Sequence, residues 1–161
     1  MATTRKTPAR PAAAPKAQDA IAMLRADHKK VSGLFDDFEK SRSVAKKKTI
    51  VATICDELTV HAQLEEEIFY PAVKAALKDR ELVPEATVEH ATVKDLIGQL
   101  KGVEPDGEMY DAKVKVLAEY VKHHVKEEQN EMFPRAKKTR VDMTELGARM
   151  TARKAELMNG M

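Results

Sequence analysis

Four of the five histidines in this chain occur where an amphipathic helix would place an apolar residue. These are His28, His61, His90 and His124. Two of them are followed by a carboxylate four residues later, as His61-Ala-Gln-Leu-Glu65 and His124-Val-Lys-Glu-Glu128. Residues four apart lie on the same face of a helix, so each pair can direct an imidazole and a carboxylate to one interior point. Buried groups of this kind need partners, and a metal ion provides one for all of them.

The spacing of these residues repeats along the chain. The first two stripe histidines are 33 residues apart, and the last two are 34 apart. Each HxxxE pair is followed by an aromatic residue and a proline, as Tyr70-Pro71 and Phe133-Pro134. The repeat predicts two related helix pairs folded about a pseudo-twofold axis. Such an axis would bring four imidazoles and two carboxylates into one layer of the interior.

A set of six nitrogen and oxygen ligands favours two transition-metal ions over a single tetrahedral zinc ion. Imidazole and carboxylate ligands inside a helical bundle are typical of a di-iron environment, so we expect two non-haem iron ions. If Glu65 and Glu128 bridge the ions, each iron receives two histidines. An oxo or hydroxo bridge would fill one further position and leave room for a small ligand. A single HxxxE pair is more often a surface salt bridge, and the prediction therefore depends on the combination.

His123 is an alternative to His124, because it could pair with Glu127. His124 is favoured, since it continues the Leu117–Val121 stripe and its distance to the following proline matches that of His61. We interpret His123 as a polar neighbour of the site. Four other acidic residues are interpreted as solvated or outer carboxylates: Glu66, Glu67, Glu127 and Glu131. Cys55 is interpreted as a helix-packing residue.

The periodicity of apolar residues predicts the helices that position these groups. The expected helices are 19–41 with Asp19 as its cap, a long helix from Ser43 with a kink or break near Pro71, one from Pro84, one from about Glu108, and one near 142–158 capped by Asp142. The prediction is an all-α, antiparallel up-down four-helix bundle with an additional C-terminal helix. We expect a disordered basic tail (1–18), a bundle (19–138) and a C-terminal amphipathic helix (139–161). That helix could cover the bundle as a lid or support a homodimer, and the sequence leaves both open.

Composition agrees with long helices in a reducing environment. The chain is 43% hydrophobic and 34% charged, with only 4% aromatic residues. Cys55 is the single cysteine, which excludes an internal disulfide and fits the cytoplasm. The longest uncharged runs of the helical region, such as Thr49–Cys55, have only seven residues. A membrane span needs about 20, so none is predicted, and no secretory signal is expected.

The positive charge of the chain is concentrated near its N-terminus. Residues 1–17 hold four basic residues and no acidic one, so the remainder has 24 basic against 26 acidic residues. A nucleic-acid-binding domain usually concentrates positive charge on its folded part. Nucleic-acid binding is therefore not expected of the bundle, and only the tail could support it.

The pattern His28 … His61-x-x-x-Glu65 … His90 … His124-x-x-x-Glu128 resembles the hemerythrin-like, or HHE cation-binding, family. The resemblance covers residues 20–137. It implies a four-helix bundle with a non-haem di-iron centre. The four histidines would be terminal iron ligands, and Glu65 and Glu128 would be the bridging carboxylates.

The chain departs from the oxygen-carrying hemerythrins at two positions. Lys94 stands where these proteins have a fifth histidine, and Gln129 stands where they have an aspartate. The departure argues against reversible oxygen carriage. It leaves binding, sensing or detoxification of a small diatomic or peroxide ligand, and an enzyme of this kind would be a peroxide- or NO-consuming oxidoreductase. The alternatives are an iron-responsive storage or regulatory protein, or a helical interaction protein with a basic tail and a structural metal site.

Overall fold

The computed structural model describes residues 18–105 and 107–161. The predicted tail lies outside the described residues, apart from Gln18. All regular elements in the described ranges are helical: α1 (Ala20–Lys40), α2 (Val44–Leu64), the π-helical turn η1 (Glu65–Phe69), α3 (Tyr70–Leu77), α4 (Leu82–Leu100), α5 (Gly107–Glu127), the π-helical turn η2 (Glu128–Met132), α6 (Phe133–Lys137) and α7 (Met143–Asn159). The predicted all-α class is confirmed.

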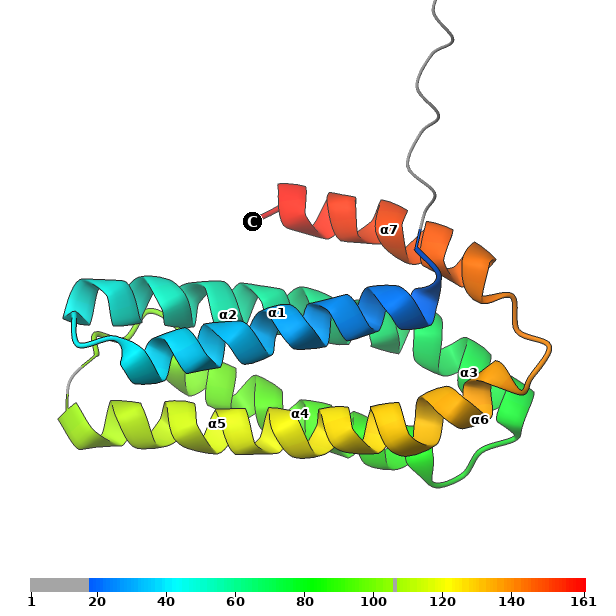
Figure 1. The fold of residues 1–161 in the computed structure, drawn as a ribbon, viewed down its shortest axis with the longest axis horizontal. Coiled ribbons are helices and arrows are strands. Elements are labelled where there is room, and N and C mark those ends of the chain that lie inside the picture. The colour runs from blue at the N-terminus through cyan, green and yellow to red at the C-terminus, as the bar shows by residue number, and fades with distance from the viewer. Residues whose placement is uncertain (1–17, 106) are drawn as a thin grey trace, which may run out of the picture.

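The four long helices form an up-down bundle. Their direction alternates from α1 to α2 to α4 to α5, with α1 packed on α2 and α4 packed on α5 (Figure 1). None of the helices in the described part of the chain combines the length and apolarity needed to cross a membrane.

Acidic side chains determine where several helices begin. Asp19 and Asp142 accept backbone N–H groups at the starts of α1 and α7, as predicted. The start of α4 differs from the prediction, because it begins at Leu82 rather than at Pro84. The Asp79 carboxylate accepts three successive backbone N–H groups there and stabilises the earlier start.

Each of the two prolines follows a π-helical turn, and neither proline interrupts the helix. A kink or break was expected near Pro71, but a π-helical turn precedes it, in which the Tyr70 N–H bonds to the Glu65 carbonyl. The second helix pair repeats this arrangement, with the Phe133 N–H bonded to the Glu128 carbonyl. Each proline then lies in the first turn of the next helix, where its missing N–H costs little. The i→i+5 closure brings Glu65 and Tyr70 to the same side of the helix.

Two apolar clusters fill the bundle, one on each side of the histidine layer. One cluster lies around the π-helical turns and includes Leu24, Leu64, Phe69, Phe133 and Met150. The other lies toward the opposite end of the long helices and includes Val31, Ile54, Val93 and Leu117. Along each long helix the predicted metal ligands lie between members of the two clusters. The polar layer is therefore enclosed by apolar packing.

Helix α7 covers one side of the bundle. It packs on α1 and α2 and on η1, and Leu146 and Met150 are buried in the cluster around the π-helical turns (Figure 1). The sequence left open whether this helix covers the bundle or supports a homodimer. The structure shows it packed on the bundle, and the homodimer stays a prediction. Gly147 permits the close approach: a Cβ there would overlap the Gln18 carbonyl and would lie 2.9 Å from the Ala20 nitrogen.

We expect Gly147→Ala to lower the free energy of unfolding by about 1–3 kcal/mol, because the methyl group would displace α7 from the start of α1. Urea unfolding measures this change. Gly33→Ala is the matched control, since open space surrounds that helical glycine. It should stabilise the protein by about 0.5–1 kcal/mol. Equal gains in both variants would contradict the close contact.

Candidate metal centre

The structure brings the six predicted ligands together in one buried layer. They come from all four long helices and both π-helical turns: His28 (α1), His61 (α2), Glu65 (η1), His90 (α4), His124 (α5) and Glu128 (η2). The six residues form two groups, each containing two histidines and one carboxylate, whose potential ligand atoms lie within 4.8 Å of one another. The groups are His28, His61 and Glu128, and Glu65, His90 and His124. Two groups of three ligands suit two metal ions.

Each of the two carboxylates reaches imidazoles from both helix pairs. The distances from a carboxylate oxygen to a histidine Nε2 are 3.2 Å for Glu128–His28, 3.2 Å for Glu128–His124, 3.0 Å for Glu65–His61 and 3.3 Å for Glu65–His90. Glu128 uses Oε1 toward one pair and Oε2 toward the other. Glu65 turns Oε1 toward both of its histidines, so each carboxylate is shared between the two helix pairs.

Several buried polar atoms of this layer have no hydrogen-bond partner among the described residues. They are both ring nitrogens of His28, Nε2 of His61, both carboxylate oxygens of Glu65 and Oε1 of Glu128. Some of them lie close enough to one another for contact, but their geometry is not that of a hydrogen bond. Nε2 of His28 lies 3.2 Å from Oε1 of Glu128, and Nε2 of His61 lies 3.0 Å from Oε1 of Glu65. Because an unpartnered buried carboxylate is costly, this donor set fits bound cations.

Three of the four imidazoles are oriented by a carboxylate on their outer side. The distances from Nδ1 to the carboxylate oxygen are 3.0 Å for His61–Asp27, 3.1 Å for His124–Glu89 and 3.4 Å for His90–Glu66. A neutral imidazole that donates its Nδ1–H outward keeps the Nε2 lone pair directed inward. Outer carboxylates of this kind fix the tautomer of metal-binding histidines and make them better ligands.

The charges of the layer strongly perturb its protonation. Burial alone would lower the pKa of His61, but the charge of Glu65 and the hydrogen bond with Asp27 raise it to about 10. Burial also opposes the charged form of His124, yet its hydrogen bond with Glu128 helps to raise its pKa to about 11. Protons on His61 and His124 thus balance the carboxylates when no cation does. Metal binding must release these protons, so metal affinity falls as the pH falls.

Tyr70 belongs to the site, although the sequence analysis did not assign it there. Its hydroxyl donates to Glu128 Oε2 over 2.6 Å and lies 3.2 Å from Nε2 of both His90 and His124. Burial and the two nearby carboxylates raise the pKa of the Tyr70 phenol well above its usual value. The sequence does contain a signal, because the aromatic residue five positions after each glutamate is Tyr70 in one half and Phe133 in the other. Phe133 stacks on His28 with ring centres 6.0 Å apart.

Lys94 does not replace the fifth histidine as a ligand. Its ammonium group is 2.7 Å from both oxygens of Glu66, the carboxylate beside His90. Lys94 therefore pairs with a carboxylate on the outer side of the layer. The Tyr70 hydroxyl instead provides a further oxygen atom beside His90 and His124.

The remaining candidates from the sequence lie outside the layer. His123 is exposed, and its ring points to Glu127 at 3.2 Å. Cys55 lies in the apolar cluster away from the π-helical turns, and burial is the main cause that raises its pKa to about 11. That environment agrees with the packing role expected of it.

A helical bundle with a buried histidine–carboxylate layer defines a metal-binding class of protein. The chain matches the family described as Hemerythrin HHE cation binding domain over residues 19–136 and belongs to it. It is similar in fold to an HHE cation binding domain-containing protein from Mycobacterium kansasii, with a TM-score of 0.75, 24% identity and 89% of each chain covered. It is also 32% identical over 111 residues to a protein from Nostoc sp. named DNA nickase. That match covers 69% of this chain and 31% of the relative, so the chain spans about a third of its length.

Helix α7 also reaches the metal layer through one ion pair. The Lys154 ammonium is 2.8 Å from Asp27 Oδ1, and Asp27 Oδ2 is 3.0 Å from Nδ1 of His61. Burial would raise the pKa of Asp27, but its bonds to His61 and Lys154 lower it, so it stays ionised. Lys154 thus holds the carboxylate that orients His61.

We expect Lys154→Met to weaken metal binding by about tenfold, because Asp27 would lose the cation that fixes it against His61. Competition with a chromogenic chelator measures the affinity. Arg149→Met is the matched control, since it removes the same charge from an exposed position of α7. Equal affinities in the two variants would show that α7 does not act on the layer through this contact.

Proposed function

We propose that the protein holds two non-haem iron ions in this layer and uses them to bind, sense or detoxify a small oxidant: O2, NO or peroxide. His28 and His61 would hold one ion, and His90 and His124 the other. Glu65 and Glu128 would bridge them, and the Tyr70 hydroxyl adds an oxygen donor in the second half. Bound iron would supply the electrons and an open coordination position.

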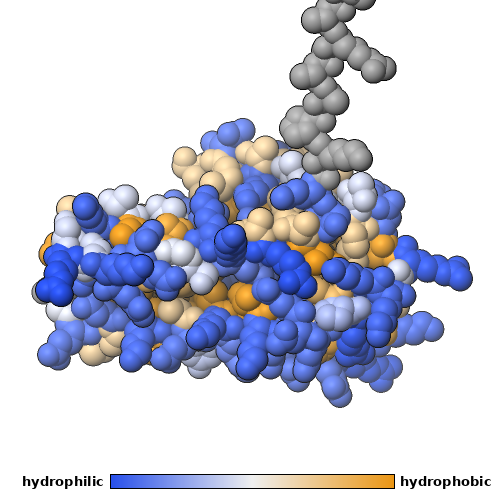
Figure 2. Space-filling view, in the orientation of Figure 1, coloured by the Kyte–Doolittle hydropathy of each residue, from blue (hydrophilic) through white to orange (hydrophobic). Residues whose placement is uncertain are grey.

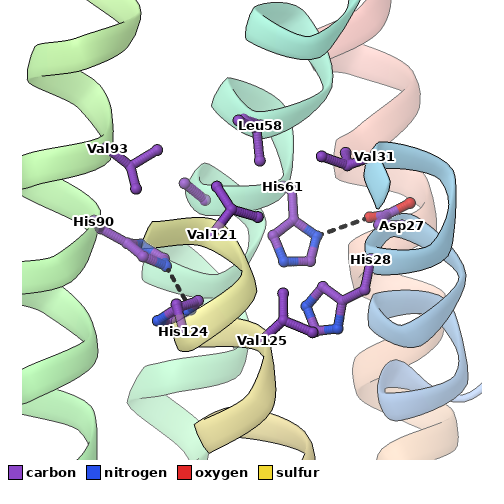
Figure 3. A pocket seen from close by; sticks show the side chains of 11 residues that line it. Asp27, His28, Val31, Leu58, His61, His90, Val93, Val121, His124 and Val125 are labelled. Atoms are coloured by element: carbon purple, nitrogen blue, oxygen red, sulfur yellow. Dashed lines mark hydrogen bonds and ion pairs between the residues drawn. The ribbon is translucent and has the colours of Figure 1, made fainter. Parts of the chain in front are cut away.

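The observation that carries this proposal is a small apolar cavity directly against the imidazoles. Its volume is about 30 Å³, and its lining includes all four histidines and a set of aliphatic side chains (Figure 3). The aliphatic residues are Val31, Leu58, Val93, Val121 and Val125. A water molecule needs only about 10–15 Å³ of such space. The cavity is therefore large enough for a diatomic molecule or peroxide.

A surface groove between α1 and α5 provides a route to this cavity. The groove has a volume of about 390 Å³ and shares His28, Val121 and Val125 with the cavity. Apolar surface appears among the polar residues on this face of the molecule (Figure 2). Small movements of the two valines would open the route, because their side chains and the His28 ring line both the groove and the cavity. The chain thus excludes bulk water from the layer and admits a small solute.

We expect two iron ions per chain in protein purified without chelators or a metal-affinity column, measured by mass spectrometry of the metals. Glu128→Gln and His61→Ala should lose iron, because each removes a donor from the layer. Glu131→Gln is the matched control, since this carboxylate of the same π-helical turn is exposed. Circular dichroism verifies that each variant remains helical. Protein without metal after anaerobic Fe(II) loading would contradict the proposal.

Filling the cavity should separate oxidant chemistry from iron storage or iron-responsive regulation. We expect Val93→Leu to keep both irons but to slow peroxide or NO consumption by about tenfold or more, because the larger side chain occupies the ligand space. Stopped-flow measurement of peroxide or NO loss tests this. Val93→Ala, which enlarges the cavity, is the matched comparison and should retain consumption. Wild-type protein that holds iron without consuming either oxidant would instead favour storage or regulation.

Nucleic-acid binding through the basic tail remains an alternative. The named activity of the Nostoc relative is compatible with it, but that protein is about three times as long as the matched portion. In the described bundle, the group of residues best suited to chemistry is the buried histidine–carboxylate layer, which DNA cannot reach. Iron chemistry therefore remains the leading proposal, with a cytoplasmic location as predicted from the sequence.

A further inference from the structure

A second histidine–carboxylate group lies on the surface beside the buried layer. Glu89 of α4 and His123 and Glu127 of α5 present ligand atoms within 4.8 Å of one another. His123 Nε2 is 3.2 Å from Glu127 Oε1 and 3.7 Å from Glu89 Oε2. The His123 side chain is 62% exposed. Solvent therefore reaches this group directly.

Glu89 connects the surface group with the buried layer. One of its oxygens faces the exposed His123, and the other lies 3.1 Å from Nδ1 of His124. Nε2 of the same His124 ring lies in the buried layer, 3.2 Å from Glu128. The two groups are therefore in direct contact, since Glu89 of the surface group touches His124 of the buried layer.

The carboxylates of the surface group differ from the other carboxylates around the layer in their ion-pair partners. Asp27, Glu66 and Glu67 are each paired with a lysine or an arginine. Within the described ranges, Glu89 and Glu127 form ion pairs only with imidazoles. The partners of these two carboxylates are thus the exposed His123 and, for Glu89, also the buried His124.

The outward pair on α5 has no polar counterpart in the other half of the bundle. His123 and Glu127 form a second HxxxE pair, shifted by one residue from His124 and Glu128. In the other half of the repeat, the corresponding positions are Val60 and Leu64. These two residues are buried in the apolar cluster to which α7 contributes. The outward pair on α5 is therefore a local addition to one half of the molecule.

We propose that Glu89, His123 and Glu127 form a surface site for a divalent transition-metal ion, from which Fe(II) passes to the buried layer. One imidazole and two carboxylates, completed by water, suit Fe(II), Co(II) or Zn(II). Two carboxylates without a lysine or arginine partner favour the approach of a cation to this group. Glu89 then places the bound ion next to His124. The loading role rests on the proposed di-iron centre, whereas the surface site itself does not.

Equilibrium dialysis of the metal-free full-length protein with Co(II) tests the site. We expect wild-type protein to bind three ions and the His123→Ala/Glu127→Gln variant to bind two. Glu119→Gln, another exposed carboxylate of α5, should keep three. Glu89 is left unchanged because its substitution would also disturb His124.

A time course of anaerobic Fe(II) loading, stopped with a chelator, tests the transfer. The double variant should reach the same final two irons but load about tenfold more slowly. Identical Co(II) stoichiometry in wild type and variant would overturn the surface site, and equal loading rates would overturn the transfer. A Co(II) ion that is lost with His123 in a protein without buried iron would uphold the surface site while contradicting the proposed function.

Discussion

The structure depends on keeping two carboxylates and four imidazoles partnered inside an apolar bundle. Glu65 and Glu128 are 0% and 1% exposed, and apolar clusters close the layer on both sides. Water cannot satisfy these groups at that depth, so either protons or cations must balance them. Several inward nitrogens and oxygens have no hydrogen-bond partner, while the outward nitrogens of three imidazoles face carboxylates. This contrast indicates a layer arranged around cations at its centre.

The π-helical turns make this arrangement possible on continuous helices. An α-helix presents residues five apart on different faces, but a turn closed by an i→i+5 bond brings them to the same side. Glu65 and Tyr70 can therefore both face the layer, as can Glu128 and Phe133. The proline that follows each turn lacks the N–H that a regular α-helix would use there, which disfavours the narrower alternative. The proline and the π-helical turn before it thus together determine which side chains face the layer.

The features that could be predicted from the sequence are those that depend on the spacing of residues along a single helix. The sequence identified the four long helices, the inward stripe histidines and the choice of His124 over His123, because each follows from spacing along one helix. It did not identify the π-helical turns, since a proline signals interrupted hydrogen bonding without specifying how the chain adapts. It also missed contacts that only the tertiary structure creates. Lys154 and Asp27 are 127 residues apart, and no periodicity relates a lysine on α7 to a ligand on α2.

The pseudo-twofold symmetry is broken in ways that make the two halves of the layer chemically different. Phe133 stacks on His28 in one half, and α7 fixes His61 through Asp27. The other half contains the Tyr70 phenol. Metal ions held in the two halves would therefore have different ligand sets. His28 is the histidine shared by the cavity and the groove between α1 and α5, so the groove adjoins the half without the phenol. The asymmetry thus places the groove beside one half and a buried phenol oxygen in the other.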